Sequence, residues 1–361
     1  MKNRFNFIVL LIAICCAGSA LGQQPKQFLG IRAPETALNA PYVFDLQGKT
    51  TLFGLYYVDG RRDVSALQLT DDDRWTTLGE NGNAITGVEG NFFSDFTLDK
   101  NKVPWLLTYY TRPSNPDRED RFFLYTLKEN RWVVAGPKAG HKADFSGGEN
   151  LFFVDGHLTL TYITWDRKTK SDYRRWFVMS DGQWREHSTD GLIPRGSRVY
   201  ADKDQSFVVN QKNSRLTIHK FPGPKSKTLG KPKFEIELPE QQTLGDLYFH
   251  KGGLGALTLY DANSETILHK CIQSDGKIAL KKLPNVDEHI LIDVLWTSAN
   301  TMLAATCDFG TARVYQFNGD KNTWKLREEQ DDLSRGRLDS PCFTILGKDK
   351  PVVTWEEFYE K

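Results

Sequence analysis

A short polar turn recurs at a fixed interval along most of this chain. Five copies are 48 residues apart, each followed by an apolar run, and they centre on Gly156, Asp204, Gly252, Asn300 and Lys348. Two earlier copies centre on Gly48 and Asn101, at spacings of 53 and 55 residues. A period of this length, built from strand-like segments, is typical of a β-propeller. The repeats therefore predict an all-β chain that forms a single seven-bladed β-propeller with four-stranded antiparallel blades.

The second repeat defines the expected strands most clearly. Aromatic and β-branched runs alternate with turns rich in Asp, Asn and Lys, which is the signal for strands and hairpins. The four predicted strands cover residues 92–98, 103–110, 121–127 and 131–134.

A tryptophan follows the second tight turn in four repeats. These residues are Trp75, Trp132, Trp184 and Trp324, and Phe234 and Leu280 stand near the equivalent place in two others. A large apolar side chain that packs between neighbouring blades explains this recurrence without any functional role.

The last repeat supplies only two strand-like runs, at residues 342–346 and 352–355. A blade of two strands would leave an unpaired edge. The segment 27–31 precedes the first repeat and has strand character. We therefore expect this N-terminal strand to pair into the last blade and close the ring.

The first 22 residues have the pattern of a secretory signal peptide. Lys2 and Arg4 precede about ten apolar residues, which are too few to span a bilayer, and small residues follow. We expect cleavage before Gln23, so that residues 23–361 form one propeller domain in a secreted or periplasmic protein. Lipid anchoring at Cys16 is less favoured because Cys15 and Ile14 precede it. No later segment is long and apolar enough to insert into a membrane.

Charge and cysteine content limit the possible partners. The net charge is +1 for the whole chain, and without residues 1–22 it becomes −1. This balance gives no electrostatic case for nucleic acid or for an anionic membrane.

Three cysteines remain beyond residue 22. Either Cys307 and Cys342 pair, or these two and Cys271 are all small buried residues in strands.

The candidate ligand site lies where the long loops of a propeller gather, on one face of a rigid scaffold. Six residues before each central turn, five repeats carry residues suited to binding: Tyr42, Asp95, Asn150, Arg198 and Asp246. Asp293 is one place away from this register. Arg112 and Arg174 stand in long charged loops, and arginine recognises carboxylate or sulfate groups. Such a polar mouth would bind an anionic or hydroxyl-rich ligand, although a solvated, self-paired loop surface also accounts for these charges.

Two polar turns resemble the Asp box of sialidases. They are Ser180-Asp-Gly-Gln-Trp184 and Asn318-Gly-Asp-Lys-Asn-Thr-Trp324, and Gly30-Ile-Arg-Ala-Pro34 faintly resembles the sialidase segment whose arginine binds the substrate carboxylate. Over residues 27–361 the chain resembles sialidase-like and Kelch-like secreted propellers as a broad class. It departs from sialidases because no arginine triad with a Tyr and Glu pair can be placed, and because seven units are expected instead of six.

Other motifs are absent from the sequence. No metal-ligand spacing, phosphate-binding loop, dinucleotide fingerprint or nucleophile elbow occurs, so neither a metal nor a cofactor is expected. The leading prediction is an exported, non-catalytic, monomeric propeller that recognises a glycan or a protein on its loop-rich face. The alternative is a glycoside hydrolase or polysaccharide lyase in which Asp95 and Asp246 act across the channel mouth.

Overall fold

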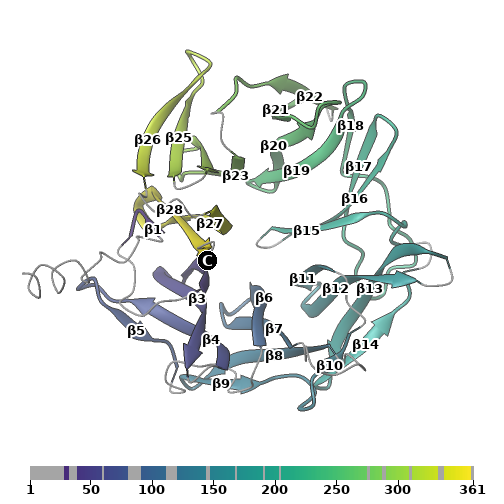
Figure 1. Cartoon of the computed structure of the whole chain (residues 1–361). Coiled ribbons are helices and arrows are strands. Elements are labelled where there is room, and N and C mark those ends of the chain that lie inside the picture. The colour runs from purple at the N-terminus through teal and green to yellow at the C-terminus, as the bar shows by residue number, and fades with distance from the viewer. Residues whose placement is uncertain are drawn as a thin grey trace, which may run out of the picture.

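A computed structural model of the chain contains antiparallel sheets arranged in a ring (Figure 1). The structure describes residues 28–31, 39–58, 61–79, 91–110, 120–143, 147–166, 169–189, 192–202, 205–274, 277–286, 290–308, 311–331 and 337–358. The predicted signal peptide and Arg112 lie outside these residues.

Six of the sheets are complete blades, which we number 1 to 6 in chain order. Blade 1 comprises β2 (Asn39–Leu46), β3 (Lys49–Val58), β4 (Arg61–Leu69) and β5 (Trp75–Thr77). Blade 2 comprises β6 (Asn91–Leu98), β7 (Pro104–Tyr110), β8 (Arg121–Lys128), β9 (Arg131–Val134) and β10 (His141–Lys142). Blade 3 comprises β11 (Gly147–Val154), β12 (His157–Asp166), β13 (Ser171–Ser180) and β14 (Gln183–His187).

The second half of the chain continues the pattern. Blade 4 comprises β15 (Arg198–Asp202), β16 (Gln205–Lys212), β17 (Arg215–Lys220) and β18 (Phe234–Glu237). Blade 5 comprises β19 (Thr243–His250), β20 (Gly253–Tyr260), β21 (Thr266–Ser274) and β22 (Lys277–Lys282). Blade 6 comprises β23 (Ile290–Trp296), β24 (Met302–Asp308), β25 (Thr311–Asn318) and β26 (Thr323–Asp331). A three-stranded sheet contains β1 (Phe28–Leu29), β27 (Arg337–Leu346) and β28 (Lys350–Phe358), with the 3-10 turn η1 (Gly347–Asp349) between β27 and β28.

The prediction of an all-β propeller with four-stranded antiparallel blades is confirmed, but the predicted number of seven blades is wrong. Within the described residues, six sheets have at least four strands. The last repeat contributes only β27 and β28, and the N-terminal segment adds a strand of just two residues. In blade 2 the outer strand is interrupted, so that β9 and β10 both pair along the same edge of β8.

The recurring turns join the first and second strands of the sheets, as the spacing predicts. Gly48 and Gly156 adopt φ values of 81° and 78°, and Asn300 and Lys348 adopt 63° and 62°. This left-handed conformation suits glycine and asparagine and costs other residues energy, which explains the small polar residues at most of the turns. Asp204 lies outside the described residues. The four strands expected in the second repeat match β6 to β9 within one residue at each end.

The core is divided among the contacts between neighbouring sheets. The described residues form seven apolar clusters, and each joins two sheets that are adjacent in the ring. The cluster between blades 3 and 4, for example, contains Phe152 and Trp176 from blade 3 with Val208 from blade 4. Each blade therefore buries its two faces against its neighbours, as repeat proteins do.

The recurring tryptophans lie between blades, as predicted. Trp132 is 6% exposed, and Trp75, Trp184 and Trp324 pack against inter-sheet clusters while remaining partly buried. Two indole N–H groups bond back to the preceding blade. Trp132 Nε1 donates to the carbonyl of Leu78 at 2.9 Å, and Trp324 Nε1 donates to the carbonyl of Pro284 at 3.0 Å.

The three-stranded sheet lies between blade 6 and blade 1. Phe28 and Leu29 of β1 pair with Thr354 and Val353 of β28. Leu29 is 7% exposed and belongs to the apolar cluster shared with blade 6. On the other side, the hydroxyl of Thr354 donates to the carbonyl of Pro41 in blade 1 at 2.6 Å. Residues from the two ends of the described chain thus lie side by side.

Candidate functional site

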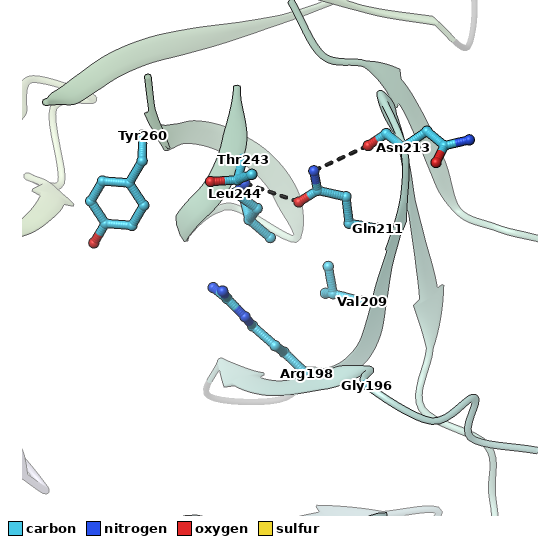
Figure 2. Close-up of a pocket in the computed structure, with 8 residues that line it drawn as sticks. All are labelled: Gly196, Arg198, Val209, Gln211, Asn213, Thr243, Leu244 and Tyr260. Carbon is cyan, nitrogen blue, oxygen red and sulfur yellow. Dashed lines mark hydrogen bonds between the residues drawn. The ribbon is translucent and has the colours of Figure 1, made fainter. Parts of the chain in front are cut away.

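A polar pocket opens between blades 4 and 5. We call the side of the ring where the first strand of each blade begins the loop face. The pocket lies on this face, because it is formed at the start of β15 and β19 and at the end of β16 and β20. Its volume is about 540 Å³. It is lined by Gly196, Arg198, Val209, Gln211, Asn213, Thr243, Leu244 and Tyr260 (Figure 2).

Arg198 gives this pocket its charge. Among the eight described residues that line it, Arg198 is the only one with an ionisable side chain that is charged at neutral pH. Figure 2 shows its side chain extending into the space between Tyr260 and Gln211. Arg198 is exposed, and one guanidinium N–H donates to the carbonyl of Gly245 at 2.5 Å. Arginine has five N–H donors in a rigid fork, which suits a carboxylate or sulfate group.

The opposite wall of the pocket is held by a bridging amide. Gln211 Oε1 accepts from the backbone N–H of Leu244 at 3.0 Å, and its Nε2 donates to the carbonyl of Asn213 at 3.1 Å (Figure 2). The first bond links blade 4 to blade 5. Gln211 therefore fixes the two blades at the point where the pocket forms.

Next to the pocket, Arg198 lies near the carboxylate of Asp246, a residue that is exposed. The hydroxyl of Tyr200 lies close to both, and burial together with the charge of Asp246 raises the pKa of Tyr200. Burial raises the pKa of Asp246, while Tyr200 and Arg198 act in the opposite direction. Asp246 Oδ1 also accepts from the N–H of Leu247 at 2.8 Å.

Asp293 lies near Asp246 on the first strand of the next blade, and the two carboxylates repel each other. Burial raises the pKa of Asp293 to about 7, and its Oδ1 accepts from the N–H of Val294 at 2.6 Å. Asp95 has the same local bond, from the N–H of Phe96 at 2.7 Å. The three aspartates stand where the pairing of the first strand shifts register, so each carboxylate satisfies a backbone donor at a β-bulge.

Asp95 is far from the other two acids in the ring. It belongs to blade 2, and blades 3 and 4 separate it from Asp246 in blade 5 (Figure 1). Its Oδ2 accepts from the N–H of Leu151 in blade 3 at 2.5 Å, and burial raises its pKa to about 7. The pair of carboxylates that the structure brings together is therefore Asp246 with Asp293, whereas the sequence analysis had paired Asp95 with Asp246.

The remaining candidate residues have contacts inside the protein. Tyr42 stacks on Phe93 of blade 2 with ring centroids 4.4 Å apart. Asn150 Nδ2 donates to the carbonyl of Gly148 at 3.0 Å. Arg174 is only 8% exposed and donates to that same carbonyl at 2.7 Å. Of the sequence candidates, Arg198 is the one that lines the pocket.

Sequence reasoning missed most of the pocket wall. Gln211, Thr243 and Tyr260 stand at strand ends in two different repeats, and none belongs to the register that suggested the ring of polar residues. Tyr260 is 43% exposed although it ends an apolar strand. The position of Tyr260 in its repeat could have indicated its role. It is the last residue of the second strand of blade 5, and such residues lie at the loop face.

Three further observations concern metals, membranes and cysteines. In the described part of the chain, His, Cys, Asp and Glu side chains form no group of three or more that could hold a metal ion. No helix there has the length and apolar character that a membrane crossing requires. Cys307 and Cys342 are thiols and not a disulfide, and Cys271 and Cys307 are buried.

No family model matches the chain, and no curated protein is similar to it in sequence. Among solved structures, a prolyl endopeptidase is similar with a TM-score of 0.51 at 12% identity, over 88% of this chain and 46% of that one. A Bombyx mori GH32 β-fructofuranosidase gives a TM-score of 0.39 at 11% identity over 99% and 96% of the two chains. The NanB sialidase from Streptococcus pneumoniae gives 0.37 at 10% identity over 93% and 67%.

At these identities the similarity concerns the fold alone. The chain is a β-propeller that matches no specific family. What the chain binds must therefore be argued from its own residues.

Proposed function

We propose that this chain is a non-catalytic binding propeller whose pocket between blades 4 and 5 recognises an acidic glycan through Arg198. The observation that carries the proposal is the exposed guanidinium of Arg198 in a polar pocket whose described lining residues include no acidic side chain. A carboxylate there would accept two parallel hydrogen bonds from the arginine fork. Gln211, Asn213 and Thr243 supply donors and acceptors for sugar hydroxyl groups.

The proposal predicts that Arg198→Ala weakens binding of an acidic glycan roughly tenfold to a hundredfold. A hydrogen bond to a charged group contributes about 1.5–3 kcal/mol, which corresponds to that range of dissociation constants. A glycan array with residues 23–361, with and without calcium, would identify the ligand. Titration calorimetry would then compare the parent chain with the variant.

Arg185→Ala is the matched control. Arg185 is exposed, pairs with Asp181 and lies next to the turn between β13 and β14, on the opposite side of the ring. This variant should bind as the parent does. Equal affinity for the parent and Arg198→Ala would refute the proposed site, and binding to a protein without any glycan binding would favour a protein partner instead.

The second candidate is a carbohydrate-active enzyme, a glycoside hydrolase or a polysaccharide lyase. The observation in its favour is that Asp246 and Asp293 are neighbours, since glycoside hydrolysis uses a pair of carboxyl groups. Backbone N–H groups occupy both carboxylates, which favours a structural role. New reducing ends or unsaturated products from a bound polysaccharide would decide for the enzyme.

We further propose that the chain acts outside the cytoplasm as a monomer, after removal of residues 1–22. The same proposal includes ring closure by the β1–β28 pair, supported by the burial of Leu29 and by the bond from Thr354 to Pro41. A closed ring leaves no sheet edge that needs a second chain.

A further inference from the structure

Two exposed aromatic side chains flank the arginines on the loop face of blades 3 to 5. Trp165 is 50% exposed at the end of β12 in blade 3, and Tyr260 is 43% exposed in the pocket wall of blade 5. Between them, in blade 4 and the segment that leads into it, stand the exposed residues Arg195 and Arg198. They are the two aromatic residues among the exposed large hydrophobic side chains of the described residues, and each combines an apolar ring with a polar edge.

The pairing of β12 with β13 places Trp165 on the side of blade 3 that faces blade 4. Trp165 pairs with Asp172, and Thr161 pairs with Trp176 in the same uninterrupted register. Residues four apart on a strand share a sheet face. Trp176 packs in the apolar cluster between blades 3 and 4, so Trp165 lies above that contact.

Arg195 joins this part of blade 3 to the pocket. Its guanidinium donates to the hydroxyl of Ser171, at the start of β13, at 3.2 Å. The next residue in the chain, Gly196, already lines the pocket, and Arg198 follows two residues later. Trp165, Arg195, Arg198 and Tyr260 therefore lie along the loop face of three consecutive blades, and we call this set the track.

We propose that the track binds an extended acidic oligosaccharide, of which the pocket holds one unit. This inference rests on the proposed function and specifies its ligand. The carboxylate of a uronic acid unit meets Arg198, and sugar rings on either side pack on Tyr260 and Trp165. Packed sheets are about 10 Å apart. The track runs from blade 3 to blade 5 and so covers two of these distances, which is more than one sugar ring can span. The ligand must therefore have several sugar units.

The charges along the track indicate which unit lies where. Asp172 is exposed directly opposite Trp165, so this end disfavours a carboxylate and suits the uncharged face of a sugar ring. Arg195 and Arg198 stand in the middle, where the acidic group is expected. Affinity should therefore depend on chain length as well as on charge.

The test uses titration calorimetry with a disaccharide and an octasaccharide of galacturonic acid. The parent chain should bind the octasaccharide at least tenfold more tightly than the disaccharide. Trp165→Ala should lose about tenfold affinity for the octasaccharide and none for the disaccharide. Arg198→Ala should weaken the binding of both.

Ile272→Ala is the control for Trp165→Ala. Ile272 is 44% exposed on β21, near the far end of that strand from the loop face, and its replacement should leave both affinities unchanged. Melting temperatures of all variants check the fold. If Trp165→Ala binds the octasaccharide as the parent does, or loses the same affinity for both ligands, the proposal that the track binds an extended chain is wrong. The proposal that the pocket binds an acidic sugar would still stand. If Arg198→Ala also binds as the parent does, or the parent binds neither ligand, the proposed function fails as well.

Discussion

Replacing Gly30 by alanine is expected to destabilise the propeller by roughly 2–4 kcal/mol, because it displaces β1. Gly30 follows β1 directly and has a φ of 90°. A Cβ atom there would lie 2.2 Å from the carbonyl oxygen of Pro351, which is backbone that cannot swing away. If β1 leaves, the burial of Leu29 is lost, and burying one leucine is worth about 1.5–3 kcal/mol. The measurement is denaturant unfolding followed by tryptophan fluorescence.

Gly48→Ala is the control for Gly30→Ala. It measures the loss of stability that comes only from placing an alanine in the left-handed conformation, without a steric clash. Gly48 has a φ of 81°, and a Cβ there would meet nothing within 4 Å. We expect this variant to lose about 1–2 kcal/mol of stability, from backbone strain alone.

Deleting residues 23–34 should reduce the free energy of unfolding at least as much as Gly30→Ala does. If the truncated chain melts like the parent, the idea that β1 closes the ring is wrong.

The second large effect is a loss of stability as the pH rises from about 4 to about 7. Burial raises the pKa of Asp95 and of Asp293 to about 7 in the folded chain, from an ordinary value of about 4. Between these two values the unfolded carboxyl is ionised while the folded one keeps its proton. The folded state then binds more protons, so the free energy of unfolding falls with rising pH and levels off above about 7. A difference of about three pKa units corresponds to roughly 4 kcal/mol for each group.

Asp293→Asn should remove one of the two contributions to the loss of stability with rising pH. The asparagine oxygen can still accept from the N–H of Val294, and the repulsion from Asp246 disappears. We therefore expect this variant to be more stable than the parent at pH 8 and nearly equal to it at pH 4. Thermal unfolding across this range checks the result. Asp181→Asn, on an exposed turn, is the control that should follow the parent curve. Parallel curves for the parent and Asp293→Asn would contradict the assignment.

The sequence predicted the local pattern well, because local chemistry determines it. Turns at Gly48, Gly156 and Asn300 need left-handed backbone, and the apolar runs around them alternate as strands do. The tryptophans at the second turn were also predictable, since a large apolar side chain at a fixed repeat position packs against the next repeat. The number of complete blades could not be predicted in the same way, because the last repeat supplies two long strands while the N-terminal segment adds a strand of only two residues.

The pocket could not be derived from the sequence for a different reason. Its wall combines Arg198, Gln211 and Tyr260, which come from two repeats and meet only when blades 4 and 5 pack together. The repeat register identified Arg198 and Asp246, but it could not tell that Tyr200 lies close to both or that Asp293 is the neighbouring acid. These relations depend on β-bulges that shift the first strands by one residue.

The pairing of β1 with β28 has a consequence for biosynthesis. Phe28 and Leu29 emerge from the ribosome before all six complete blades, whereas their partners Thr354 and Val353 are made only after blade 6. Blades 1 to 6 can form in chain order as they are synthesised or exported, but β1 has no docking strand until β28 has been made. Until then Leu29 stays exposed, so we expect quality-control proteases and chaperones to act mainly on chains that lack this last step.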